Sequence, residues 1–449
     1  MPTAAYPDIA KMYLTSQHEA QYPGGLRLPT LRWLQGSLYV YDKDHYVELE
    51  PEVYKSQLTI WLASKNYNTL KDYREVDSHV KAALVAASPR SLHSWASAAR
   101  TGRWLAFRNG ILNLTRLLKD GTVELLAHSP DWVSTTVMPY DFNQEAQCPT
   151  WMRCLSDWFP QEKDTQSLVQ EMSGYILWTE LPFHGGFFLE GTGSNGKSTY
   201  INTMQKMVGP SNYSCLALEE FSRNFALNAT VDKLVNFASE MDPGAKLPIG
   251  TLKRFTGSDE LTIDRKYQKQ ITFRATAKLI VAWNERPVIK DTSDGFWRRM
   301  RIIPFRQKFV EGAGADIDLE SKLAQELPGI LNWAVAGLRR LMAAKAFTVS
   351  ASGFAANANF RDQSDPIRAY LLEFWEMGEG DPIPKNLIYQ HYVDNRIDPE
   401  AEPLLEGKFF KELYRCLPGV VAGRVRGSVA GTRVPTISGI RPKKEHSSD

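Results

Sequence analysis

Apolar and polar positions change their spacing several times along the chain, and each change predicts a different kind of element. Residues 38–50 place two aromatic-rich stretches on either side of a polar Asp-Lys-Asp turn, which predicts a β-hairpin. Residues 51–100 carry apolar side chains at helical spacing. A strand-rich segment at 104–114, a turn and a further strand-forming stretch at 123–126 follow. Together these elements predict a mixed α+β domain over residues 1–165.

The pattern becomes regular in the middle of the chain. Residues 149–178 predict helices with one apolar face, and residues 185–305 then alternate strands with helices. Such alternation is typical of a parallel α/β sheet. A long helix is expected over residues 319–344, with a break at the Pro328-Gly329 pair. The sequence therefore predicts an α/β fold class with its core domain at residues 166–345.

The last part of the chain has a different composition. Residues 346–366 are rich in Ala, Ser and Asn and predict a linker or an exposed helix. Residues 367–449 predict a small C-terminal domain of helices with a hairpin within 420–434, for which a winged helix is one candidate fold. Nine Lys or Arg residues stand against three acidic residues in 406–445. This local charge suggests a polyanionic partner, and an ordinary solvated surface explains it equally well.

Composition sets limits but names no function. At 449 residues the chain is too long for one hydrophobic core. Its apolar share of 43%, its charged share of 23% and its net charge of +2 are ordinary for a soluble globular protein. No apolar run approaches the ~20 residues of a membrane helix, and no signal-peptide pattern opens the chain. Four cysteines without a Cys-x-x-Cys pair argue against a zinc site or disulfide framework, so we expect a cytoplasmic protein without membrane contact.

The most informative motif lies between an apolar strand and a helix. The strand at 187–189 runs into Gly191-x-x-x-x-Gly196-Lys197-Ser198, and a helix at 200–208 follows. In a phosphate-binding loop, the backbone N–H groups and the helix amino end face phosphate oxygens, the lysine adds a full charge, and the hydroxyl can ligate Mg²⁺. A glycine-rich turn with a chance lysine is the alternative. The predicted ATP-binding residues are Gly191, Thr192, Gly193, Ser194, Asn195, Gly196, Lys197, Ser198 and Thr199.

Two later strands end in polar side chains that can complete such a site. The strand at 234–238 leads to Glu240 and then Asp242, and a further strand ends at Asn284. Open α/β sheets bind ligands at the carboxyl ends of their strands, so we expect Glu240 to hold Mg²⁺ and activate the attacking water. We expect Asn284 to orient that water and sense the γ-phosphate. An ordinary strand-end acid and an ordinary turn asparagine are the alternatives.

Basic residues gather in two further places. Arg298, Arg299 and Arg301 could stabilise the transition state of phosphoryl transfer or form ordinary surface ion pairs. Residues 261–263 and 271–273 predict the two strands of a hairpin with a basic tip. Such a tip can bind phosphates and stack a base, although basic hairpin tips are often only solubility devices. The candidate DNA-binding residues are Lys253, Arg265, Lys266, Tyr267 and Lys269.

Taken in order, five motifs resemble those of superfamily 3 helicases of the kind found in phage, plasmid and poxvirus-type primase-helicases. The motifs occupy residues 191–198, 238–240, 253–257, 282–287 and 296–305. The resemblance implies a modified AAA+ core, a hexameric ring, and 3′→5′ translocation on single-stranded DNA. It implies ATP and Mg²⁺ as cofactors. It implies single-stranded and forked DNA, further copies of the chain, and a primase or polymerase as partners.

The resemblance also implies roles for single residues. Lys197 and Ser198 would bind phosphate and Mg²⁺, Glu240 would activate water, and Asn284 would be the sensor. Many relatives carry two adjacent acids at the strand end, whereas this chain carries one, so Asp242 is expected to share the metal.

The ring implied by the resemblance gives the arginines and the hairpin their roles. Arg298 or Arg299 would reach the ATP of the neighbouring subunit, and segment 253–274 would supply a hairpin that grips DNA in the pore. Two other functions share the phosphate loop. An origin-recognition or loader ATPase would switch on ATP without unwinding DNA, and a small-molecule kinase would phosphorylate a metabolite.

Overall fold

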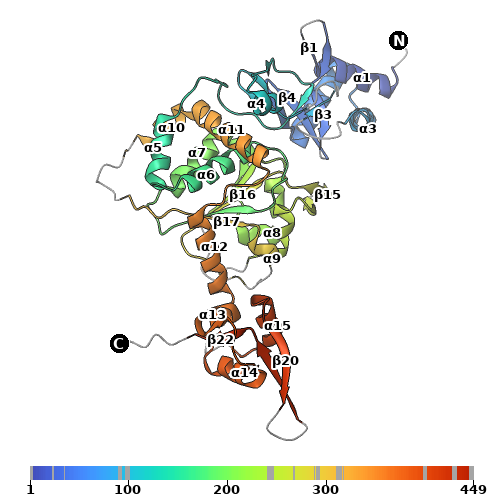
Figure 1. Ribbon diagram of the computed structural model, residues 1–449. Coiled ribbons are helices and arrows are strands. Elements are labelled where there is room, and N and C mark those ends of the chain that lie inside the picture. Colours follow the sequence, from blue (N-terminus) through green and yellow to red (C-terminus); the bar gives the residue numbers. More distant parts are fainter. Residues whose placement is uncertain are drawn as a thin grey trace. The chain divides into compact units, whose positions relative to one another are not determined.

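The computed structural model describes residues 4–443, except for gaps at 23–24, 35, 89–93, 97–101, 240–246, 266–267, 288, 290–293, 310–315, 317, 398–401 and 427–431. The chain divides into two compact units (Figure 1). The larger unit comprises residues 1–285 and 298–354, and the smaller one comprises residues 286–297 and 355–449. Among the described residues, no helix combines the length and the apolar composition that a transmembrane span requires.

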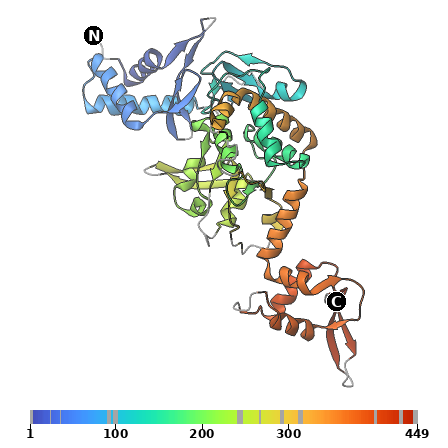
Figure 2. The same ribbon diagram turned by 90° about the vertical axis from the view of Figure 1, so that its left-hand side faces the viewer.

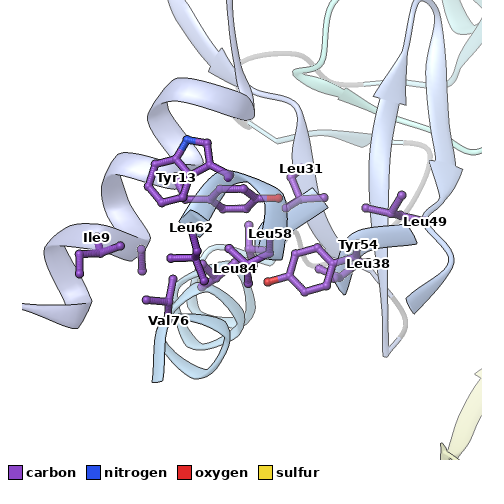
Figure 3. Packing of buried hydrophobic residues seen from close by; sticks show 13 residues of the cluster. Ile9, Tyr13, Leu31, Leu38, Leu49, Tyr54, Leu58, Leu62, Val76 and Leu84 are labelled. Atoms are coloured by element: carbon purple, nitrogen blue, oxygen red, sulfur yellow. The ribbon is translucent and has the colours of Figure 1, made fainter. Parts of the chain in front are cut away.

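The larger unit begins with three helices packed against short antiparallel strands. Its elements are α1 (Tyr6–Gln17), β1 (Glu19–Gln21), β2 (Arg27–Pro29), β3 (Leu31–Leu34), β4 (Ser37–Asp42), β5 (His45–Glu48), α2 (Pro51–Ser64) and α3 (Leu70–Ala86). Side chains from these helices and from β3 and β4 point into one apolar cluster around Leu58 and Val76 (Figure 3). The predicted hairpin at 38–50 and the predicted helices within 51–100 are confirmed by β4–β5 and by α2 and α3.

A second group of strands follows, and here one prediction was wrong. The elements are β6 (Ser94–Trp95), β7 (Trp104–Phe107), β8 (Gly110–Asn113), α4 (Leu114–Asp120), β9 (Leu125–Leu126) and β10 (Trp132–Val133). The strand-rich segment predicted at 104–114 is confirmed as a hairpin of β7 and β8. The Asn109 side chain fixes its turn, because it bonds both the N–H and the carbonyl of Phe142 at 2.9 Å.

The wrong prediction is the turn expected between residues 114 and 123, because this segment forms the helix α4. The Asn113 side chain caps it by accepting from the Arg116 N–H at 3.1 Å. The helix ends at Gly121, which has a φ of +81°. This left-handed backbone conformation is common for a glycine that terminates an α-helix. The Asn113 cap therefore stabilises a helix that the spacing of apolar residues alone did not indicate.

The centre of the larger unit is a wholly parallel five-stranded sheet in the order β12-β13-β16-β11-β17. Its strands are β11 (Gly186–Glu190), β12 (Tyr213–Ser214), β13 (Val235–Ala238), β16 (Lys278–Trp283) and β17 (Met300–Pro304). Nearly every residue of β11, β13, β16 and β17 is buried, as expected for strands covered on both faces. The predicted α/β class with a parallel sheet is confirmed.

Helices accompany the sheet within the same unit. They are α5 (Pro149–Trp158), α6 (Lys163–Ile176), α7 (Lys197–Val208), α8 (Ile249–Thr256), α10 (Leu319–Gln325) and α11 (Leu327–Ala344) (Figure 1). Close packing of α6 on α11 depends on two glycines. A Cβ on Gly174 would lie 2.2 Å from the Ala334 carbonyl oxygen, and one on Gly337 would lie 2.3 Å from that of Gln170. The domain boundary predicted at residue 165 falls inside α6.

The break predicted in the helix at 319–344 is confirmed, although it falls at Glu326 instead of the Pro328-Gly329 pair. Pro328 occupies the first turn of α11, where its missing N–H costs no helical hydrogen bond. The Glu326 carboxylate instead accepts from the N–H groups of Thr150 and Trp151 in the first turn of α5, each at 3.0 Å.

A two-stranded hairpin, β14 (Glu260–Arg265) and β15 (Gln268–Arg274), extends from the part of the larger unit that holds α8 (Figure 1). Leu261 pairs with Phe273 and Ile263 with Ile271 in its register. Buried Leu261 and Ile263 hold one face of the hairpin. The Asn228 amide secures its backbone by donating to the Asp264 carbonyl at 2.7 Å. The predicted hairpin is thus confirmed, with its tip outside the described residues.

The linker predicted at 346–366 contains the helix α12 (Ala351–Ser364). The smaller unit then comprises α9 (Asp294–Trp297), α13 (Pro366–Phe374), β18 (Trp375–Met377), β19 (Ile383–Pro384), α14 (Lys385–Asp394), α15 (Glu406–Cys416), β20 (Val421–Arg426), β21 (Arg433–Ser438) and β22 (Ile440–Pro442). Its core is one cluster centred on Tyr370, Phe409 and Ile437. The predicted C-terminal hairpin is confirmed as β20 and β21, drawn in red in both views (Figures 1 and 2).

Candidate functional site: a glycine-rich loop at the edge of the parallel sheet

Strand order brings three chain segments to one edge of the sheet. The register pairs Glu190 of β11 with Trp283 of β16, and Ala238 of β13 with Val281 of β16. The glycine-rich loop, residues 191–198, leaves β11 at this edge, and Asn284 follows β16 there. Because β16 lies between β11 and β13, Asn284 lies between the loop and the carboxyl end of β13. This is the edge at which open parallel sheets bind ligands.

The backbone of the glycine-rich loop requires its glycines. Gly193 and Gly196 have φ values of +97° and +93°. A Cβ on Gly196 would lie 2.1 Å from the indole nitrogen of Trp158. A Cβ on Gly191 would lie 2.6 Å from the Phe305 carbonyl oxygen. The loop is therefore held between α5 and the end of β17, and side chains at these two glycines would displace it.

The Lys197 side chain lies beneath this loop at the first residue of α7. It is only 6% exposed. Its ammonium donates to the Gly191 carbonyl at 2.6 Å, and to the side-chain oxygens of Asn195 and Asn284, each at 3.1 Å. Asn195 in turn donates to the Phe305 carbonyl at 3.3 Å. The structure thus brings together Lys197 and Asn284, which are 87 residues apart in sequence.

A cavity of about 960 Å³ opens beside the loop. It is lined by residues 193–199, by parts of α5 and α7, and by Ser239, Ala282 and Asn284 at the strand ends. The volume is at the upper end of what small-molecule sites usually offer. The N–H groups at the start of α7 and the Lys197 ammonium give this end of the cavity a positive potential. The described residues therefore fit a bound polyphosphate, and the exposed Ser198 hydroxyl fits a Mg²⁺ ligand.

Ion pairs fix the rim of the cavity. Lys322 donates to Asp316 at 2.8 Å and lowers the pKa of that carboxyl, and Arg153 of α5 lies 3.7 Å from the same group. Lys206 of α7 donates to Glu320 at 3.0 Å and likewise lowers its pKa. These pairs are exposed, so each adds little to stability, but together they position α10 beside α7.

Several predicted residues lie outside the described part of the chain. Glu240, Asp242, Lys266 and Tyr267 are among them, and the side chains of Arg265 and Lys269 are also not described. Ser239, the residue before Glu240, lines the cavity. The predicted roles of these residues stay predictions.

The predicted arginines lie at the other edge of the sheet. Arg298 and Arg299 immediately precede β17, whose parallel pairing with β11 places them at its amino end. The five residues of β17 separate them from the loop edge, a span of roughly 16 Å at strand geometry. Arg298 is exposed and Arg299 is partly buried near Gly257, which follows α8. Neither arginine lines the cavity of its own chain.

Lys253, another predicted DNA-binding residue, lies on α8 and is partly buried. Two residues that the sequence did not single out are important at the site. Trp158 supports Gly196 from below, and Phe309 lines the cavity while its N–H donates to the Ser194 carbonyl at 2.8 Å. Neither lies in a recognisable motif, so only their tertiary position identifies them.

Two family models match parts of the chain. One described as "D5 N terminal like" matches residues 30–160, and one described as a family of unknown function (DUF5906) matches residues 189–299. The second match includes the glycine-rich loop, Asn284 and Arg298.

Curated relatives come from viruses. A protein of Acanthamoeba polyphaga mimivirus named "Putative helicase L207/L206" is 34% identical over 136 residues, which are 29% of this chain and 14% of that protein. "Putative helicase 121R" of Invertebrate iridescent virus 3 is 27% identical over 227 residues, 46% of this chain and 23% of that protein. The matched part is thus less than a quarter of either relative.

Solved structures show a similar fold. Two apo structures of the NrS-1 C-terminal region match with TM-scores of 0.52 and 0.50, each at 12% identity and each covering 90% of this chain and 93% of that one. The predicted resemblance is therefore confirmed in a coarse form: over its matched segments, the chain is similar to viral proteins that carry the name helicase.

Proposed function

We propose that this protein is an ATP-dependent replicative DNA helicase of the superfamily 3 type with an AAA+ core. The observation that carries the proposal is the Lys197 ammonium, enclosed by the glycine-rich loop and 3.1 Å from Asn284 on the neighbouring strand. A buried lysine facing a cavity at a helix amino end is arranged to meet a polyphosphate. The similarity to viral proteins named helicase extends the proposal from nucleotide binding to an action on DNA.

The site residues keep the roles proposed from sequence. The loop N–H groups and Lys197 bind the triphosphate, and Ser198 ligates Mg²⁺. Bound Mg²⁺ would neutralise charge on the phosphates. Glu240 activates the attacking water, and Asp242 shares the metal. Asn284 accepts a hydrogen bond from the Lys197 ammonium. A γ-phosphate that attracts this lysine would break that bond, and on this ground we propose Asn284 as the sensor.

We assign DNA contacts to two hairpins. We propose that the β14–β15 hairpin grips single-stranded DNA through Lys266 and Lys269, which follow β14 in the sequence. In the smaller unit, α13, α14, α15 and the sheet β19-β21-β20 support the proposal of a winged helix. Arg426 and Arg433 lie directly opposite each other on β20 and β21. Like charges so placed repel each other, which a bound polyanion would offset.

We further propose that the motor is a ring, a hexamer by its resemblance, that moves 3′→5′ in the cytoplasm of an infected or plasmid-bearing cell, together with a primase or polymerase. The arginines support assembly. Arg298 is exposed at the sheet edge opposite its own cavity, so any part that it takes in hydrolysis would be at the cavity of a neighbour. Its exposure favours Arg298 over the partly buried Arg299 as this group.

Two other functions remain as alternatives. An origin-recognition or loader ATPase would use the same residues without processive unwinding, and ATP-dependent strand displacement on a forked duplex distinguishes it. A small-molecule kinase would phosphorylate a metabolite in the absence of DNA. It leaves the hairpin and the C-terminal arginines without a role, so we rank it last.

The proposal is tested by Lys197→Ala. Removing the ammonium leaves the phosphate charge without its main side-chain counter-ion, so DNA-stimulated ATP hydrolysis should fall to background while the melting temperature without nucleotide changes little. Lys206→Ala is the matched control, because it removes a lysine from the same helix whose partner is Glu320 on the rim. A Lys197→Ala protein that hydrolyses ATP at the wild-type rate would refute the assignment of the loop.

A further inference from the structure

The cavity is longer than a triphosphate needs. Ser198, Ile201, Asn202 and Gln205 line it from successive turns of α7. Their spacing of three and four residues puts them on one face of the helix. Gln205 is eight residues beyond Lys197, or about 12 Å along the helix axis at 1.5 Å per residue. The cavity therefore continues well past the phosphate end of the site.

The remaining lining includes apolar groups. Ile201, Leu319 at the start of α10, and Cys154 of α5 all line the same space. The start of α10 is fixed beside α7 because Glu320 accepts from Asn202 and from Lys206, each at 3.0 Å. Apolar walls do not help to bind phosphates, whose oxygens require donors and positive charge. They suit an apolar part of a ligand that also carries phosphates.

Two aromatic side chains line this cavity, Trp158 and Phe309. Trp158 is 5% exposed and packs under Gly196, whereas Phe309 is 42% exposed, so its ring is the more accessible of the two to a ligand. A partly exposed phenyl ring is ordinary on a protein surface when it stands alone. Phe309 differs because the segment that carries it is fastened to the glycine-rich loop at both ends. The Phe305 carbonyl accepts from Asn195 at 3.3 Å, and the Phe309 N–H donates to the Ser194 carbonyl at 2.8 Å. The ring is thus held beside the loop that would bind the phosphates.

We propose that Phe309 is the stacking platform for the base of a nucleoside triphosphate, so that base and phosphates are held by two connected parts of one cavity. The inference rests on the proposed nucleotide-binding function and adds a residue that positions the nucleoside half of the substrate. Base–aromatic stacking contributes enough free energy to change affinity by about 5- to 150-fold. The π face of the Phe309 ring is the property that the proposal depends on, because an aliphatic side chain of similar volume cannot stack on a base in the same way.

The test compares two ligands on the full chain in the presence of Mg²⁺. One is adenylyl-imidodiphosphate, which carries a base and resists hydrolysis. The other is inorganic tripolyphosphate, which offers the phosphates alone. Titration calorimetry gives both affinities for the wild type and for Phe309→Ala, Phe309→Leu and Phe309→Trp. Phe354→Ala is the matched control, since it removes a phenyl group that is 69% exposed and does not line the cavity.

We expect Phe309→Ala and Phe309→Leu to reduce the affinity for the nucleotide analogue by about 5- to 150-fold and to leave the affinity for tripolyphosphate unchanged. Phe309→Trp and Phe354→Ala should bind both ligands as the wild type does. Equal loss for both ligands in Phe309→Ala would show that the residue only shapes the loop, and unchanged nucleotide affinity would show that the base lies elsewhere. Either result overturns the inference about Phe309. Binding of tripolyphosphate by the wild type would still support the proposed role of the glycine-rich loop in phosphate binding. A wild type that binds neither ligand overturns the proposed function itself.

Discussion

At the scale of the residue, the glycine-rich loop depends on close contacts in which a glycine cannot be replaced without a steric clash. Gly196 combines a φ of +93° with the indole of Trp158 directly beneath it. Trp158 also contacts Phe305, with ring centroids 5.9 Å apart, so the support under the loop is itself packed against the end of β17. The position of the Lys197 ammonium therefore depends on aromatic packing in α5 as much as on the loop.

Gly196→Ala should damage this arrangement. The new Cβ would lie 2.1 Å from the Trp158 indole nitrogen and would require a left-handed backbone at alanine, for a combined cost of about 1–4 kcal/mol. We expect at least a tenfold loss of ATP affinity and a lower melting temperature, measured by calorimetry and thermal unfolding. Gly250→Ala, in α8, is the control, because its Cβ would meet no atom within 4 Å. Normal ATP binding by Gly196→Ala would mean that the loop does not need this geometry.

At the scale of the element, the β14–β15 hairpin has a fixed base. Leu261 and Ile263 are buried, and Thr262 and Thr272 share a hydrogen bond of 3.1 Å on the other face. A short connection joins β15 to the next strand, β16, and Asn284 directly follows β16. A change at the nucleotide site could therefore reach the hairpin through β16, which would couple the grip on DNA to the state of ATP.

Lys266→Ala and Lys269→Ala should weaken single-strand binding and stop unwinding, yet leave DNA-free ATP hydrolysis near normal. Each lost phosphate contact should reduce the slope of log affinity against log salt by about one unit. The control is Arg274→Ala, because Arg274 lies at the base of the hairpin and pairs with Glu260 at 3.3 Å. If the lysine variants unwind normally and deletion of residues 408–444 abolishes translocation, the C-terminal segment is the gripping element instead.

At the scale of the whole molecule, the two sheet edges carry different parts of the proposed chemistry. The glycine-rich loop and Asn284 lie at the carboxyl edge, and Arg298 and Arg299 lie at the amino edge. If one of these arginines takes part in hydrolysis as proposed, it acts on the cavity of a second copy. The proposal therefore predicts that hydrolysis requires at least two copies of the chain.

Mixing two inactive variants tests this arrangement. Lys197→Ala lacks the cation that binds phosphate, and Arg298→Ala lacks the group offered to the neighbour. Each should be inactive alone, and a mixture should regain part of the wild-type rate, because some interfaces then combine an intact loop with an intact arginine. ATP turnover is measured against mixing ratio and protein concentration. Full activity of a monomer at every dilution contradicts the model, and restoration with Arg299→Ala in place of Arg298→Ala transfers the role to Arg299.

The sequence by itself determined the local features. The loop between β11 and α7, the alternation of strand and helix, and the hairpins β4–β5, β14–β15 and β20–β21 were all predictable. Each depends on residues close in the chain: glycines at a tight turn, apolar side chains with a period of two or 3.6, and polar residues at a tip. The helix α4 was predicted as a turn, because its seven residues are too few to show a helical apolar spacing.

Only the tertiary structure decided how these features meet. Strand order puts β16 between β11 and β13, and so brings Asn284 to Lys197, whereas the chain order is compatible with other arrangements. The parallel direction of β17 puts Arg298 at the opposite edge. Trp158 and Phe309 reach the loop from elements before and after it in sequence. These placements come from packing between distant segments, which local spacing does not encode.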